Sequence, residues 1–323
     1  MSRMPNPDGE VSSLSPSEFI ARMAGHPNLP DYADLLEQVA AINAVVPTSF
    51  PVVDGLPELR IRTDLRVDGY AADIINVIFL NQGVLDFALQ AGRQATEAFA
   101  SLNFPSLLGP NSLARLFFLW SYAHELMHIL RRHALVTENF GSNRQISHAF
   151  ECDADMCSVA CLYRMIRAAS PNEPPFRCKV LTLTGIYWAM RALAESDLTA
   201  DGDDQHPSLI SRVVDVPHKL SMMIDSGTPD QSASRPQTRE EFSDLIAHTY
   251  DLERLYMASV HPGISFDAGV LRQYVANSHM STTQIERRQT WDRIEQFVMQ
   301  ASIISRNLVE NNENIVFMNE FNF

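Results

Sequence analysis

The spacing of apolar side chains along the chain predicts a protein made mostly of helices. Residues 31–46 place apolar side chains three or four positions apart, as in Leu35, Val39 and Ile42, and the pattern ends before Pro47. The same helical period predicts further helices over residues 84–102, 112–134, 147–169, 180–196, 206–224, 240–259 and 282–305.

A different pattern occupies residues 51–81. β-branched and other apolar residues alternate with arginines at 59–62, and residues 74–80 form a short apolar run, so this region predicts two or three short strands. Because strands are few and helices many, the sequence predicts an α+β fold dominated by helices. The small sheet precedes the helix expected at residues 112–134.

Polar segments divide the chain. Residues 1–16 predict a disordered N-terminus, and residues 226–241, rich in Ser, Pro and charged side chains, predict a linker or a long surface loop. Residues 17–225 then form the main domain, and residues 242–323 form a C-terminal helical segment.

The charge balance excludes some classes of partner. The 323 residues include 25 Lys and Arg against 39 Asp and Glu, which gives a formal net charge of −14. No basic stripe stands out to neutralise a nucleic-acid backbone, and the acidic total disfavours an anionic membrane surface. The two most apolar windows, residues 70–90 and 113–130, contain charged side chains and predict no membrane span.

The cysteines and the N-terminus indicate a cellular compartment. Three of the four cysteines lie within one predicted helix, where their spacing makes poor disulfides, and the first 30 residues contain no apolar secretory core. We therefore expect reduced thiols and a cytoplasmic protein. The oligomeric state is left open.

One short segment carries residues suited to metal chemistry. On a helix, His124 and His128 project from the same face one turn apart, a spacing that lets two imidazoles bind one zinc ion. Glu125 follows the first histidine and is placed to act as a general base. The alternative is a helix with two histidines that have other partners. The apolar surroundings favour the metal, because three buried titratable groups are costly without one.

A catalytic zinc site needs a third protein ligand. Arg131 and Ala134 occupy the positions where a metzincin would have Gly and His, so that class is excluded. The next helix offers Glu151 and Asp155, four apart on one face. Glu151 is then the ligand, and Asp155 reaches the N–H of a ligand histidine. Alternatively these acids form a solvated helix face, the role that we expect for Asp153.

Three segments resemble a known family. Residues 123–133 resemble the AHExxHxxxRH segment of the HtpX and CAAX-prenyl-protease group of gluzincins. Glu151-x-x-Ala154-Asp155 is similar to its ExxAD motif, and residues 206–213 resemble its HPxxxxR[IV] segment. The strand and turn at residues 76–85 are weakly similar as well. Without a membrane span, the chain looks like a soluble minigluzincin. Lit-type phage-exclusion proteases are a second relative, although no motif selects them.

The resemblance implies a zincin-like core and a zinc-dependent endopeptidase that acts on protein or peptide substrates. It implies Zn²⁺ bound by His124, His128 and Glu151, with Glu125 as the general base. His206 becomes a candidate donor to the oxyanion, and its alternative is a non-catalytic residue at a helix start. Tyr187 is a weaker candidate donor.

Other expectations concern the surroundings of the site. Arg212 either pairs with an acid near the metal or is an ordinary surface charge. His133, five residues after His128, is expected to face away from the metal. Residues 75–80 are expected to be the edge strand that binds an extended peptide. Residues 315–318 either cover the cleft or complete the core elsewhere.

Two further functions stay open beside a general endopeptidase. One is a selective toxin or defence protease that acts on one host protein, and the other is a catalytically silent, protease-like binding module. An intact Glu125 favours activity, because a binding module has no need of a general base.

Overall fold

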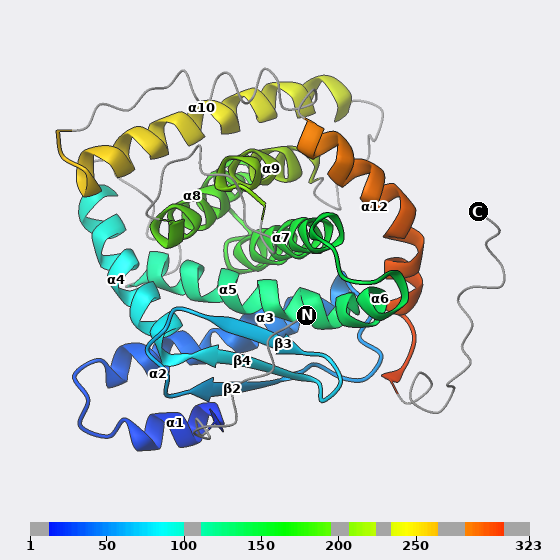
Figure 1. The fold of residues 1–323 in the computed structure, drawn as a ribbon. Helices are drawn as coiled ribbons and strands as arrows, with labels where there is room; N and C mark the ends of the chain where they lie inside the picture. The colour runs from blue at the N-terminus through cyan, green and yellow to red at the C-terminus, as the bar shows by residue number, and fades with distance from the viewer. Residues whose placement is uncertain (1–12, 100–110, 195–206, 224–233, 264–281, 307–323) are drawn as a thin grey trace.

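The computed structural model describes residues 13–99, 111–194, 207–223, 234–263 and 282–306. These form a mostly helical protein with one small sheet (Figure 1). The helices are α1 (Pro16–Arg22), α2 (Leu29–Glu37), α3 (Val39–Val45), α4 (Gln82–Phe99), α5 (Ser112–Leu130), α6 (His133–Phe140), α7 (Arg144–Ala169), α8 (Pro175–Ala194), α9 (Leu209–Met222), α10 (Ser234–Val260) and α12 (Thr282–Ala301), with a 3-10 turn η1 at Val46–Thr48.

The sheet has four strands in the order β1-β2-β4-β3. They are β1 (Ser13–Leu14), β2 (Glu58–Arg62), β3 (Gly69–Ala72) and β4 (Val77–Asn81). β4 lies inside the sheet, parallel to β2 and antiparallel to β3. Four of its five residues are buried, which explains why this stretch reads as a continuous apolar run. β3 is therefore an edge strand.

Helix α5 is the centre of the molecule. Figure 1 shows it between the sheet on one side and α7 and α8 on the other. Because it is covered from several directions, apolar side chains occupy all of its faces, including the fully buried Leu116, Phe117 and Phe118. Each such side chain contributes roughly 1.5–3 kcal/mol on burial. This packing fixes the direction of every side chain on the helix.

A cluster of four charged side chains ties the end of α5 and the segment after α12 to the loops of the sheet. Arg132, which has φ of 56°, donates to Asp54 and Asp73. Arg306 donates to the same two carboxylates. Each acid therefore bridges two arginines, so the buried charges are compensated.

The predicted fold class is confirmed: helices dominate, and a small mixed sheet precedes α5 along the chain. Among the described residues, none of the helices has both the length and the apolar character needed to cross a membrane.

Several boundaries differ from the predictions. Residues 13–16, expected to be disordered, form β1 and the start of α1, where Ser15 and Glu18 make a capping box. Residues 234–241 of the predicted linker belong to α10. The expectation of an edge strand at residues 75–80 is wrong, because β4 is paired on both sides. Residues 315–318 lie outside the described part of the chain.

A close contact between α4 and α5 gives a first prediction. A Cβ atom added at Gly92 would lie 2.7 Å from the backbone nitrogen of Ala114. Gly92→Ala must push the helices apart, so we expect it to lower the free energy of unfolding by about 1–3 kcal/mol in urea titrations, despite the better helix propensity of alanine. Gln94→Ala, on the exposed face of the same helix, is the control and should be nearly neutral. Equal stability of the two variants would contradict the contact.

Candidate metal centre

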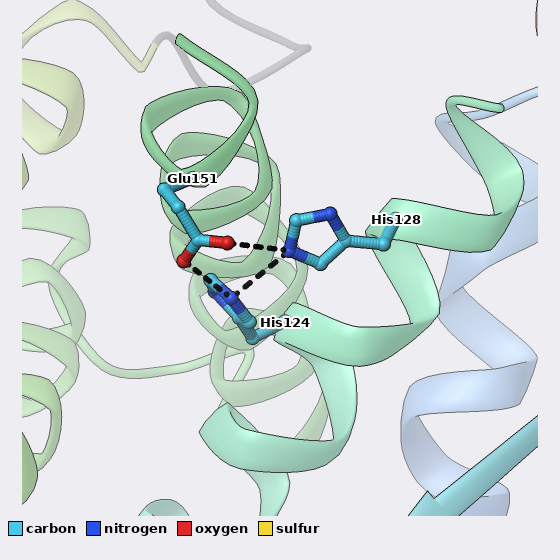
Figure 2. Close-up of side chains that lie close together, drawn as sticks. All are labelled: His124, His128 and Glu151. Atoms are coloured by element: carbon cyan, nitrogen blue, oxygen red, sulfur yellow. Dashed lines mark hydrogen bonds and ion pairs between the residues drawn. The ribbon is translucent and has the colours of Figure 1, made fainter. Parts of the chain in front are cut away.

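Three side chains from two helices converge on one point. His124 and His128 come from α5, and Glu151 comes from the first half of α7 (Figure 2). The two Nε2 atoms lie 3.1 Å apart, and Glu151 places one carboxylate oxygen 3.2 Å from His124 and the other 3.4 Å from His128. Within the described ranges, no other group of His, Cys, Asp or Glu is arranged to hold a metal ion.

The donor set fits zinc. Two imidazole nitrogens and a carboxylate oxygen are zinc ligands, with bonds of about 2.0–2.2 Å, and a tetrahedral arrangement puts neighbouring ligand atoms about 3.3 Å apart. The two Nε2 atoms are 3.1 Å apart, close to that value, and each lies 3.2–3.4 Å from a different oxygen of the Glu151 carboxylate. Three protein ligands leave a fourth position open, as in catalytic zinc sites.

The first candidate ligand, His124, is oriented by a buried ion pair. His124 Nδ1 lies 3.0 Å from Asp155, which accepts two hydrogen bonds from Arg212 at 2.7 and 2.8 Å. Although burial opposes ionisation, Arg212 and His124 lower the pKa of Asp155 to about 2. The carboxylate therefore holds the Nδ1 proton of His124 and leaves Nε2 facing Glu151. The predicted contacts of Asp155 and Arg212 are both present.

The second candidate ligand, His128, is oriented by two residues that were not expected to act on it. His133 Nδ1 lies 2.8 Å from His128 Nδ1, and its Nε2 lies 3.0 Å from Asp153. Asp153 is also paired with Arg131 at 2.8 Å. The expectation that Asp153 is solvated is wrong. His133 is not one of the three converging side chains, as expected, but its contact with the far nitrogen of His128 was not predicted.

The reason lies in the backbone between α5 and α6. Arg132 adopts a left-handed conformation that ends α5, so His133 opens a new helix and no longer follows the phase of His128. Its ring stacks on Phe150 of α7 at 4.4 Å between centroids. Asp153 therefore faces His133 instead of solvent.

The charges of the three converging groups favour a positive charge between them. Burial alone would lower the pKa of His124, but Glu151 and Asp155 outweigh it and raise that pKa to about 10. Conversely, burial alone would raise the pKa of Glu151, but the two histidines hold that pKa well below its usual range. In the metal-free protein a proton meets this demand. A metal ion meets it with all three groups at once.

Glu125 lies beside the ligands and against the sheet. A Cβ atom built on Gly69 of β3 would lie 3.7 Å from Glu125 Cγ, so the edge strand runs next to this carboxyl group. Burial raises the pKa of Glu125, and the adjacent His124 and His128 partly offset the shift. A carboxyl group with a raised pKa beside a metal centre is suited to accept and return a proton.

Two residues, His206 and Tyr187, were predicted as candidate donors to the oxyanion. His206 lies outside the described residues, which resume at Pro207. The Tyr187 hydroxyl donates to Glu253, which also accepts from Arg191, and this buried group joins α8 to α10. Tyr187 is therefore engaged with α10. The four cysteines are free thiols, as expected, and three of them are buried.

Comparison of the chain with models of protein families, with curated proteins and with solved structures finds no match.

The buried histidine His133 gives a prediction for the metal-free protein. Burial lowers the pKa of His133 to about 4, although the hydrogen bond to Asp153 acts in the opposite direction. A histidine in the unfolded chain titrates near 6.5. Between these values the unfolded chain binds more protons, so stability falls as the pH falls from 6.5 to 4. In a chelator, wild type should lose up to about 1.4 kcal/mol per pH unit more than His133→Phe in this window. Parallel stability curves for the two proteins would contradict the assignment.

Proposed function

We propose that the protein is a zinc-dependent endopeptidase with a zincin-like core, similar to the HtpX and CAAX-prenyl-protease group of gluzincins. The observation that carries the proposal is the convergence of His124, His128 and Glu151 on one point, with Glu125 next to them. The order along the chain supports it: sheet, helix with two ligands, helix with the third.

His124, His128 and Glu151 would hold the ion, and Asp155 with Arg212 would orient the first ligand. When bound, zinc acidifies water and polarises the carbonyl of a peptide bond. Glu125 accepts the proton from the attacking water and returns it to the departing amine nitrogen. His206 stays the proposed donor to the oxyanion, on the resemblance of residues 206–213 alone.

The edge strand β3 supports a peptide as the substrate. Asn81 donates its N–H to the Asp68 carbonyl, and in an antiparallel pair such bonded positions alternate. The backbone N–H and C=O groups of Gly69 and Ala71 therefore point to the open edge. An extended peptide that pairs with them would pass close to Glu125.

The retained general base favours hydrolysis over the catalytically silent binding module, because binding alone has no use for Glu125. A selective toxin or defence protease would use the same chemistry, and only the identity of the substrate separates it from a general endopeptidase. Profiling cleaved proteins with wild type beside Glu125→Gln makes that distinction.

The first test concerns the ligands and the base. The protein as purified should carry one tightly bound zinc ion, and His128→Ala should lose it because two ligands do not suffice. Glu125→Gln should keep the zinc, since Glu125 is not a ligand, while cleavage of an unfolded protein such as casein falls at least ~100-fold. Metal analysis and the cleavage assay check both. Stoichiometric zinc in His128→Ala would overturn the ligand assignment.

The second test concerns the substrate edge. Ala71→Pro removes an N–H that points away from the sheet, so the ladder between β3 and β4 keeps its hydrogen bonds. We expect the variant to fold and its kcat/KM for an unstructured peptide to fall about tenfold, the effect of one or two lost backbone hydrogen bonds. Ala71→Ser retains the N–H and is the control. Unchanged cleavage by Ala71→Pro would show that peptides bind elsewhere.

A further inference from the structure

We infer that His133 is a positioning residue for the metal: it relays the charge of Asp153 to His128 and fixes which nitrogen of His128 faces the ion. The inference rests on the metal centre of the proposed function, although it does not require peptidase activity. It is carried by a continuous chain of contacts from Arg131 through Asp153 and His133 to His128.

The direction of each hydrogen bond follows from the chemistry of its ends. Asp153 is ionised and paired with Arg131, so it can only accept, and His133 Nε2 must donate to it at 3.0 Å. A neutral imidazole that donates from Nε2 accepts at Nδ1. His128 Nδ1, at 2.8 Å, therefore donates to His133. The proton of His128 is thereby held on Nδ1, and the Nε2 lone pair is directed at His124 and Glu151.

The relay is rigid because it is buried and packed. His133 is 3% exposed and Arg131 is 7% exposed. The His133 ring lies flat on Phe150, with an angle of 11° between the planes. With Asp153 held by Arg131 on one side and the ring held by Phe150 on the other, His133 has no freedom to turn its acceptor away from His128.

The two metal-binding histidines are thus oriented by equivalent means. Asp155, backed by Arg212, contacts His124 directly, whereas Asp153, backed by Arg131, reaches His128 through a second imidazole. Asp153 and Asp155 are two residues apart on α7 and point to different sides of the helix. Only the inserted ring of His133 lets the more distant carboxylate act on the same centre.

The test is the zinc affinity of folded variants, measured by competition with a chromogenic chelator. His133→Phe keeps an aromatic ring against Phe150 and removes both hydrogen bonds, and we expect its zinc affinity to fall 10- to 100-fold. His133→Gln can accept from His128 through its carbonyl and donate to Asp153 through its amide, and it should recover most of that loss. Ile146→Val removes one methyl group from the apolar cluster that contains Phe150 and leaves the relay and its ring contact intact, so its affinity should stay within about threefold of wild type.

A second variant and a spectroscopic readout separate positioning from structure. In Asp153→Asn the amide oxygen accepts from Arg131 and an amide N–H donates to His133. His133 Nε2 then accepts and its Nδ1 carries the proton, so it no longer accepts from His128, and zinc binding should weaken about tenfold or more. This variant tests the relay even where His133→Phe fails to fold. In Co²⁺-substituted protein, both His133→Phe and Asp153→Asn should shift the visible d–d bands, and Ile146→Val should not.

Four outcomes are decisive. Weaker zinc binding and shifted bands in His133→Phe, restored in His133→Gln, support the relay. Affinity and bands equal to wild type in His133→Phe and Asp153→Asn overturn it. A wild type that binds no zinc overturns the metal centre and the relay together. A wild type that binds zinc but cleaves no peptide overturns only the peptidase, because the relay is judged by affinity.

Discussion

The structure depends on one electrostatic constraint: two imidazole nitrogens and a carboxylate are held 3.1–3.4 Å apart with their lone pairs facing one point. Such groups repel one another unless a cation lies between them. The neighbouring residues prevent the repulsion from being relieved by rotation of the side chains. Asp155 and Arg212 fix His124, and His133 with Asp153 and Arg131 fixes His128. The arrangement therefore holds two imidazoles and a carboxylate in place, as the proposed metal centre requires.

The fold supplies the rigidity that this constraint requires. Helix α5 is buried on all faces between the sheet, α7 and α8, so its two histidines cannot move apart without loss of core packing (Figure 1). The charged cluster of Asp54, Asp73, Arg132 and Arg306 anchors the end of the same helix to the sheet. The edge strand β3 then lies beside Glu125, where a backbone can pair with it.

The sequence predicted what depends on local spacing. The helices of the core, the strands of residues 58–81 and the shared face of His124 and His128 follow from periodicity and from the i, i+4 rule. Glu151 was expected beside them because a catalytic zinc site needs a third ligand and because residues 151–155 resemble a family motif. The prediction failed where the backbone changes direction. The contact of His133 with His128 was missed because a left-handed residue, Arg132, resets the helical phase before His133. The burial of Asp153 was missed because its partner is this same histidine, His133. Residues 75–80 were wrongly expected at the sheet edge because the order of strands depends on tertiary contacts and not on local sequence.

The central claim is that His124, His128 and Glu151 bind one zinc ion, and the most direct test is anomalous diffraction at the zinc absorption edge from crystals of the protein as purified. The account predicts a single anomalous peak about 2.0–2.2 Å from His124 Nε2, His128 Nε2 and a Glu151 oxygen. Crystals of a zinc-supplemented protein with no peak at these three residues, or with the ion bound elsewhere, would contradict it.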